Sequence, residues 1–218
     1  MLFNLQTRLQ NIKMVTSLAG FLKQPDSLES VFAVANSLQG SPLAEQMVTY
    51  LTNKPQFKAL LDEGWRPQAI DLAELQKLPD GSLGKCYANQ LIQLGLTPEV
   101  LIDAAPITTT SEFIRHRIGE THDIIHVLTG FGIDGCGEIG LQGFNLAQTR
   151  SALAVMLIFG SMISTLQTGE SLEPLLRALS RGFQMGLDAD LVIAQKLEEG
   201  WDRPISEWRR ELNLPVIQ

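Results

Sequence analysis

Residues 121–140 read THDIIHVLTGFGIDGCGEIG, and this stretch decides how the rest of the sequence is interpreted. It joins two apolar segments through a run that holds four glycines, at positions 130, 132, 135 and 137. Glycine relaxes the steric limits on φ and ψ, so this run favours a loop in which the chain reverses. We therefore expect a helix over about 110–129, then this loop, then a second helix that starts near Glu138.

Apolar residues recur at steps of three or four along most of the chain, which predicts helices throughout. Strand-like alternation, internal repeats and an interdomain linker are not found in the sequence. Start and stop signals place the other helices at the amphipathic N-terminus up to Pro25, over 28–38 and 42–52, after Pro55, over 85–95, from Thr97, and over 138–166, 173–186, 188–200 and 204–212. The sequence predicts a single all-α, bundle-like domain over residues 1–218.

Composition bounds the partners of the chain. Its 218 residues are 44% apolar, enough for a sizeable core, and only 19% charged. The net charge of −7, without a run of Lys or Arg, argues against nucleic acid as a partner. Two cysteines, Cys86 and Cys136, do not make a disulfide framework, so a reducing interior is the default. The low charge is compatible with a surface covered by a membrane or by a second copy in a homodimer.

The segment 151–166, SALAVMLIFGSMISTL, carries no charge over sixteen residues. It is shorter than the roughly 18 apolar residues expected of a membrane span, and it contains four hydroxyls. We interpret it as a buried helix of the core. The alternative is a helix that also lines a lipid cavity or a dimer seam.

Three candidate metal ligands fall within five residues. His122 and His126 lie four residues apart, so their imidazoles point to one side of a helix. Asp123 precedes His126 by three residues and can reach the same point from the side. The glycine loop allows Glu138, at the start of the next helix, to approach as a fourth ligand. We predict a metal site between two consecutive helices, formed by these four residues; the alternative is an ordinary polar helix face.

Two imidazoles and two carboxylates suit Zn²⁺ first, with Mn²⁺ or Fe²⁺ as alternatives and Mg²⁺ as a less natural one. The motif differs from the zincin His-Glu-x-x-His because Asp123 stands where the general-base Glu would be. Adjacent His-Asp also occurs in metal-dependent phosphohydrolases. That class uses further His and Asp residues on other helices, whereas this chain has only His116 besides, which we expect at the surface.

Arg115 lies on the same helical stripe as the histidines, seven residues before His122. An arginine there could hold the carboxylate or phosphate of a ligand. The alternative is a surface arginine paired with Glu112. Arg117 and Glu120, three residues apart, are expected to form an intrahelical ion pair.

The spaced motif His-Asp-x-x-His-x11-Glu, formed by residues 122, 123, 126 and 138, resembles that of a known family. This is the coenzyme Q (ubiquinone) biosynthesis protein family called Coq-four. Two further segments are similar to the family, LPDGSLGKCY at 78–87 and WDRPISEWRREL at 201–212. The resemblance covers most of the chain from about residue 20 onward.

The resemblance implies an all-helical protein of ubiquinone or prenylquinone biosynthesis that holds zinc or a similar divalent ion at the four motif residues. It implies substrates with isoprenoid tails and a metal-dependent oxidative decarboxylation of a prenylated hydroxybenzoate ring. The alternative is a non-enzymatic, lipid-binding scaffold that organises the other quinone-biosynthesis proteins.

The resemblance also implies peripheral association with a membrane. The first residues contain no long Arg-rich transit segment, so we expect a cytoplasmic protein at the inner membrane face of a bacterium. For a processed eukaryotic form, the expected location is the matrix side of the mitochondrial inner membrane.

Overall fold

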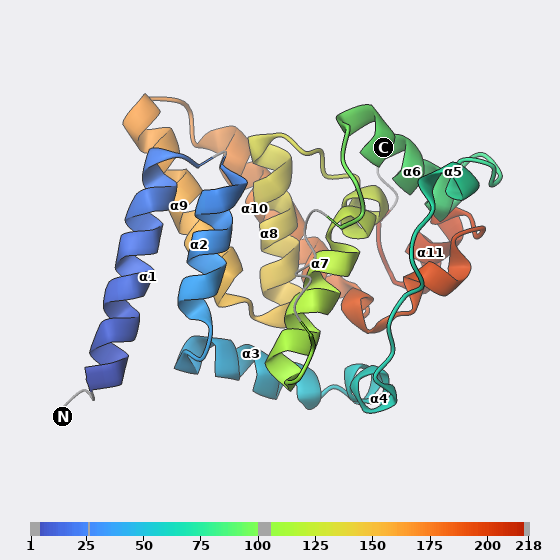
Figure 1. Cartoon of the computed structure of the whole chain (residues 1–218). Helices are drawn as coiled ribbons and strands as arrows, with labels where there is room; N and C mark the ends of the chain where they lie inside the picture. Colours follow the sequence, from blue (N-terminus) through green and yellow to red (C-terminus); the bar gives the residue numbers. More distant parts are fainter. Residues whose placement is uncertain (1–4, 26, 100–105, 216–218) are drawn as a thin grey trace. The chain divides into compact units, whose positions relative to one another are not determined.

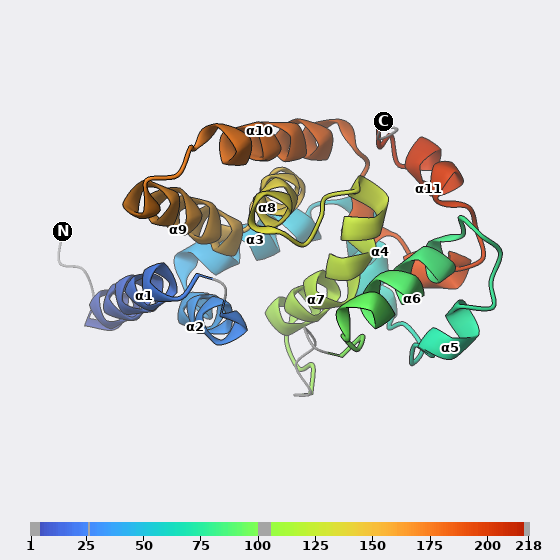
Figure 2. The same cartoon turned by 90° about the horizontal axis from the view of Figure 1, so that it is seen from above.

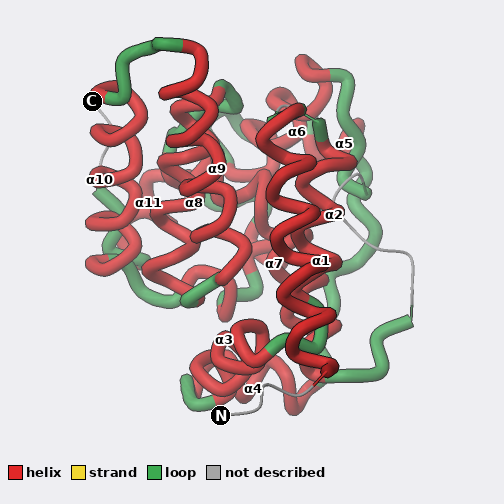
Figure 3. The backbone as a smooth tube through the Cα atoms, turned by 90° about the vertical axis from the view of Figure 1, so that its left-hand side faces the viewer, coloured by secondary structure: helices red, strands yellow, loops and turns green. Residues whose placement is uncertain are grey.

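The computed structural model describes residues 5–25, 27–99 and 106–215. This part of the chain is helical, with one isolated β-bridge between Ser82 and Pro204 and no strand (Figure 3). The all-α prediction is confirmed. In chain order the elements are α1 (Leu5–Lys23), α2 (Leu28–Leu38), α3 (Pro42–Thr52), α4 (Pro55–Glu63), α5 (Leu72–Leu75), α6 (Leu83–Leu94), α7 (Thr110–Thr129), α8 (Gly135–Thr149), α9 (Ala152–Thr168), α10 (Glu173–Asp188), the 3₁₀ turns η1 (Val192–Ala194) and η2 (Leu197–Gly200), and α11 (Ile205–Glu211).

The chain forms two compact units, each built from two separate stretches of sequence. Unit 1 comprises Met1–Tyr50 and Ile133–Leu187, and unit 2 comprises Leu51–Gly132 and Asp188–Gln218. Each unit is described by itself. The assignment of residues 1–218 to one domain stays a prediction.

In unit 1, α1 packs beside α2 and α9, and α9 beside α8 (Figures 1 and 2). Phe21, Val34 and Leu157 form a small core where α1, α2 and α9 meet. Gly160 makes room for the Phe21 ring, because a Cβ at this position would lie 2.6 Å from two ring carbons. A side chain at Gly160 would therefore push α1 away from α9.

In unit 2, α7 is enclosed by other elements: it packs against α6, η1 and α11. Its N-terminus is fixed by a capping box, in which the Thr109 hydroxyl accepts from the Glu112 N–H and the Glu112 carboxylate reaches back. Its C-terminus ends at Gly130, which adopts the left-handed conformation at φ 69°. Eleven of the twenty residues of α7 are buried, so the helix is held rigidly.

The predicted helix over 138–166 is wrong, because the chain forms two helices there, α8 and α9. Arg150 adopts a left-handed conformation at φ 58°, and the Ser151 hydroxyl then accepts from the Ala154 N–H to cap α9. The Arg150 guanidinium lies 4.1 Å from the centroid of the Tyr50 ring. Neither Arg nor Ser is a strong helix breaker, so apolar periodicity alone could not reveal this turn.

The start of α8 also differs from expectation. The helix begins at Gly135 rather than at Glu138, so two of the four glycines are helical. The Asp134 carboxylate caps the helix by accepting from the backbone N–H groups of Cys136 and Gly137. The loop after α7 is accordingly shorter than predicted, and Glu138 lies in the first turn of α8.

The predicted helix over 188–200 is replaced by the two 3₁₀ turns. The carbonyls of Ile193 and Gln195 accept hydrogen bonds from the Arg117 guanidinium instead of from a helix backbone. A distant side chain thus takes the acceptors that a regular helix would use. The short helix predicted from Thr97 falls mostly on residues 100–105, which lie outside the described residues.

The segment 151–166 is only half-buried. Ala154, Leu157 and Ile158 are buried, whereas Val155 and Phe159 are 49% and 51% exposed. The prediction of a fully buried helix is therefore wrong for one face of α9. Among the described residues, none of the helices combines the length and the apolar character needed to cross a membrane.

Candidate metal centre

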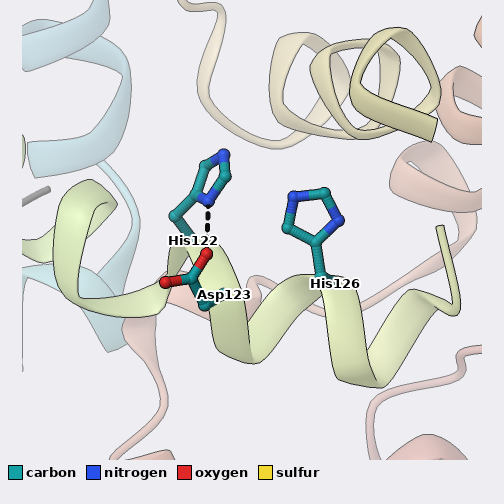
Figure 4. A group of neighbouring side chains, drawn as sticks. All are labelled: His122, Asp123 and His126. Carbon is teal, nitrogen blue, oxygen red and sulfur yellow. Dashed lines mark hydrogen bonds and ion pairs between the residues drawn. The ribbon is translucent and has the colours of Figure 1, made fainter. Parts of the chain in front are cut away.

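The structure brings together three of the predicted ligands on α7. One ligand atom from each of His122, Asp123 and His126 lies within 4.8 Å of the others. Figure 4 shows both imidazoles standing on the same side of the helix, with the Asp123 carboxylate next to the His122 ring. The spacing of four residues between the histidines produces this arrangement, because such residues share one helix face.

His126 is buried, with 1% of its surface exposed, and its ring is fixed by the chain that leaves α7. Its Nδ1 lies 3.0 Å from the carbonyl oxygen of Phe131. A carbonyl can only accept, so Nδ1 carries the proton and Nε2 holds the lone pair. In Figure 4 this Nε2 faces His122. Metal-binding histidines are typically oriented in this way by a hydrogen bond to the other ring nitrogen.

His122 and Asp123 make the second oriented contact. The Nδ1 of His122 lies 3.0 Å from Oδ1 of Asp123, and both side chains are half-buried. With an ionised carboxylate, Nδ1 donates and Nε2 holds the lone pair. The carboxylate can orient the imidazole while its other oxygen stays available for a cation.

Sequence reasoning assigned no role at this site to two residues. Phe131 orients the His126 ring through its backbone carbonyl. Every residue has such a carbonyl, so the sequence could not reveal this contact. Tyr87 of α6 is buried, and its ring packs on Trp201 at a centroid distance of 5.1 Å. Its burial first, and then the negative charges of Asp123 and Glu198, raise the pKa of the Tyr87 phenol, which therefore stays protonated at neutral pH.

Two predicted site residues remain predictions. Glu138 is half-buried in α8 of unit 1, whereas the other three ligands belong to unit 2. Arg115 is half-buried on α7. The Glu112 carboxylate accepts hydrogen bonds from Thr108 and Thr109, which lower its pKa to about 2.

The opposite side of α7 holds a buried ion-pair network. Arg117 is 1% exposed and donates to the Glu198 carboxylate at 2.5 Å. The predicted pair with Glu120 is confirmed at 3.6 Å, although Glu198 is the closer partner. Glu120 in turn pairs with Arg66 at 2.5 Å. Each of these charged side chains thus has a partner of opposite charge within the protein.

The expectation that His116 lies at the surface is wrong, because only 4% of it is exposed. It sits about 100° around α7 from Arg115. Since α6, η1 and α11 all pack on α7, this flank of the helix does not reach solvent. His116 is thus a buried histidine of the same helix outside the predicted ligand set.

Known proteins share this sequence and fold. The family model described as coenzyme Q (ubiquinone) biosynthesis protein Coq4 matches residues 4–218. The Danio rerio protein named ubiquinone biosynthesis protein COQ4 homolog, mitochondrial, is 27% identical over 209 residues, which span 88% of this chain and 72% of that protein. The Debaryomyces hansenii protein named ubiquinone biosynthesis protein COQ4, mitochondrial, is 27% identical, with 91% of this chain and 62% of that protein covered.

A solved structure is also similar. It is the crystal structure of a protein from Nostoc punctiforme PCC 73102 that is described as a candidate ubiquinone biosynthesis protein. The two chains are 31% identical and superpose with a TM-score of 0.85 over 94% of this chain and 99% of that one.

Proposed function

This chain belongs to the coenzyme Q (ubiquinone) biosynthesis protein Coq4 family, and on that premise we propose that it binds one divalent metal ion through His122, Asp123, His126 and Glu138. The family takes part in ubiquinone biosynthesis. The observation that carries the proposal is the convergence of three ligand atoms within 4.8 Å on a rigid helix. The hydrogen bond from His126 to the Phe131 carbonyl supports it, because it leaves Nε2 as the ligand atom.

Zinc is the ion that the donor set fits best, since two imidazoles and two carboxylate oxygens are common in its tetrahedral sites. Mn²⁺ and Fe²⁺ accept the same donors, and Mg²⁺ fits less well because it prefers oxygen alone. Titration of the metal-free protein with each of the four ions should give the tightest binding for Zn²⁺. Tighter binding of Mg²⁺ than of Zn²⁺ would contradict this donor set.

The substrate that we propose is a prenylated hydroxybenzoate. The proposed reaction is the oxidative loss of its ring carboxyl group. A bound divalent ion supplies a Lewis acid for a carboxylate or phenolate oxygen. Arg115 is proposed to hold the anionic group of this substrate. Replacing the carboxyl by a hydroxyl from water releases carbon dioxide, one proton and two electrons, so the reaction also needs a two-electron acceptor such as dioxygen.

Turnover of a prenylated hydroxybenzoate tests this reaction. The Glu138→Ala variant should lose turnover and bound metal while its circular dichroism stays that of a helical protein. The matched control is Glu173→Ala, which removes an exposed carboxylate from the first turn of α10. Normal turnover by the Glu138 variant would contradict the assignment of Glu138 as a metal ligand that the reaction needs, and a wild-type protein that does not turn the substrate over would contradict the reaction.

A second function, a lipid-binding scaffold, is favoured by exposed apolar side chains on two neighbouring helices of unit 1. The exposed large apolar residues of α1 and α9 are Leu9, Ile12, Val15, Val155, Phe159 and Leu166. The first 25 residues contain three basic residues and no acidic one, although the whole chain has a net charge of −7. An apolar surface flanked by cations suits the surface of an anionic bilayer.

In this scaffold function the chain would lie at a membrane, hold an isoprenoid lipid and gather other quinone-biosynthesis proteins. The relatives named mitochondrial support a mitochondrial location for a eukaryotic form. The proposed place is the matrix side of the inner membrane there, and the cytoplasmic face of the inner membrane in bacteria. Alternatively, a second copy of the chain buries the same apolar residues in a homodimer.

Sedimentation with vesicles tests the scaffold function. The protein should pellet with vesicles of phosphatidylcholine and cardiolipin, and the double variant Ile12→Glu with Val15→Glu should stay in the supernatant. Ile92→Glu, at an exposed position of α6, is the control and should pellet normally. A wild-type protein that does not pellet would count against membrane docking by α1.

A further inference from the structure

A cavity of about 520 Å³ opens in unit 2, lined by groups that the metal site does not use. Trp65, Trp201 and the segment 66–70 line it, and the chain's own Arg117 and Lys196 lie over the Trp65 ring at 4.9 and 5.9 Å from its centroid. Four carboxylates line it, those of residues 71, 74, 198 and 199, against the single cation of Arg66. This volume is typical of sites that enclose a small ligand or a large side chain. The lining charges favour a cationic occupant.

The cavity is linked to α7 through an ion pair. Arg66 lines the cavity and pairs with Glu120. Glu120 and His122 project about 160° apart around the helix, and none of His122, Asp123 and His126 lines the cavity. Occupancy of the cavity can therefore be tested separately from metal binding.

The deep charges of the cavity are already compensated. Glu198 is held by Arg117 at 2.5 Å, and Arg66 is held by Glu120. These contacts make the inner walls rigid and close to neutral. The charge that an occupant meets is therefore set at the rim.

The rim is acidic and preorganised. Asp71 caps α5 by accepting from two backbone N–H groups, and Glu199 accepts from Nε1 of Trp65 at 3.0 Å. Glu74 is 65% exposed and pairs with Lys77. Each carboxylate belongs to an exposed residue and accepts a hydrogen bond, and Oε1 of Glu199 also lies 3.9 Å from Nζ of Lys196.

The edge of the cavity carries open backbone groups. Residues 66–70 are neither helix nor turn, and no backbone–backbone hydrogen bond links them to any other residue that the structure describes. Pro67 lacks an N–H, but the other four residues each offer a donor and an acceptor. A second chain can pair with such open, partly exposed backbone groups by adding as a β-strand.

We infer that this cavity docks an extended segment of a partner protein that carries an Arg or Lys side chain. The partner's backbone pairs with residues 66–70, and its basic side chain enters the cavity. The Trp65 and Trp201 rings cover the aliphatic stem, and the rim carboxylates bind the charged head. The inference stands independently of the proposed metal site and reaction.

Tryptophan fluorescence titrations with three probes test this docking, because Trp65 and Trp201 are two of the three tryptophans in the chain. The probes are the peptide Ac-TVTRTVT-amide, the same peptide with a central Glu, and arginine amide alone. The Arg peptide should bind at least tenfold more tightly than either other probe. Equal binding of the Arg and Glu peptides, or no binding of the Arg peptide at millimolar concentration, would overturn the inference. Equal binding of arginine amide would also overturn it, by reducing the site to one for small cations.

A rim variant tests the same site from the protein side. The triple variant Asp71→Asn, Glu74→Gln, Glu199→Gln removes three charges and keeps each hydrogen-bond acceptor, and Asn caps a helix as well as Asp does. Its affinity for the Arg peptide should fall at least tenfold, with metal content unchanged. The control Glu45→Gln, Glu170→Gln, Glu173→Gln removes three exposed charges of unit 1 and should bind the peptide normally. A rim variant that binds like wild type would contradict the docking site, whatever its metal content.

Discussion

One side of α7 carries His122, Asp123 and His126, and the opposite side carries Arg117, with Glu120 on the flank between Arg117 and Asp123. Arg117 precedes His126 by nine residues, which places the two about 180° apart around the helix. On the arginine side, each buried charge meets a side chain of opposite charge: Arg117 meets Glu198, and Glu120 meets Arg66. On the histidine side, three metal-binding groups converge on one another.

The difference supports the proposal that one face of the helix serves the fold and the other binds a metal ion. A buried ion pair needs both partners, because removing one leaves an uncompensated charge in a poorly hydrated site. Two imidazoles and a carboxylate, each oriented by a hydrogen bond at Nδ1 of a histidine, are instead arranged for a metal ion. Changes on the two sides should therefore affect different measurements.

The largest effect on stability is expected from Arg117→Met. It leaves the buried carboxylate of Glu198 without its close cationic partner, whereas Glu120 keeps Arg66, and it should lower the free energy of unfolding by about 3–5 kcal/mol. Urea denaturation measures this change. Arg177→Met, which removes a 78% exposed member of an ion pair on α10, is the control and should cost less than about 1 kcal/mol. If the Arg117 variant were as stable as this control, the ion pairs of Arg117 would not stabilise the fold, and the proposed difference between the two faces would be wrong.

Substitutions on the histidine side are expected to weaken metal binding. His126→Ala removes a ligand and should weaken zinc binding on the order of 100-fold or more, as measured by competition with a chromophoric chelator. His116→Ala is a stringent control, because it removes a buried imidazole from the same helix. If both variants lost zinc equally, the loss would reflect damage to α7 rather than a missing ligand.

A smaller effect is expected from Arg209→Met at the end of the histidine side. The Arg209 guanidinium of α11 donates to the carbonyls of Leu128 and Val127 at 2.8 and 3.2 Å, which holds the last turn of α7. Its loss should lower the unfolding free energy by about 1–3 kcal/mol and weaken zinc binding less than His126→Ala does. The adjacent exposed Arg210→Met is the control, and similar unfolding curves for the two variants would argue against this role.

The smallest effect concerns the N-terminus of α7. Hydrogen bonds from Thr108 and Thr109 lower the pKa of Glu112 from 4.5 to about 2. A folded-state pKa below the unfolded one stabilises the protein above pH 4.5, and that contribution is lost as the pH falls from 4.5 toward 2. The melting temperature of Glu112→Gln, measured with EDTA, should therefore fall less steeply over this window. Glu45→Gln should retain the wild-type slope; a Glu112 variant that also retains it would refute the assignment.

Local patterns in the sequence predicted much of this arrangement. Periodicity and caps located α6 and α7, and the spacing of four residues placed two imidazoles on one side of the helix. Two features escaped prediction because they depend on distant contacts. Glu198, the closest partner of Arg117, lies 81 residues away, and the same arginine takes the carbonyls that would have extended a helix through 188–200.

Other features were hidden because residue type does not encode them. Arg150 adopts a left-handed backbone conformation, which is unusual for arginine. The sequence therefore predicted one continuous helix where the structure has α8 and α9. The burial of His116 depends on three elements that pack around α7. The carbonyl of Phe131 orients His126 through the backbone, which a sequence motif cannot show.

The coordination of a bound ion tests the central claim most directly. A zinc K-edge X-ray absorption spectrum of the loaded protein should show scattering from two imidazoles and from carboxylate oxygens, at about 2.0–2.2 Å. The same spectrum of the Glu138→Gln variant should retain both imidazoles with an altered oxygen shell. A wild-type spectrum with sulfur ligands, or with fewer than two imidazoles, would show that the metal does not bind at His122 and His126.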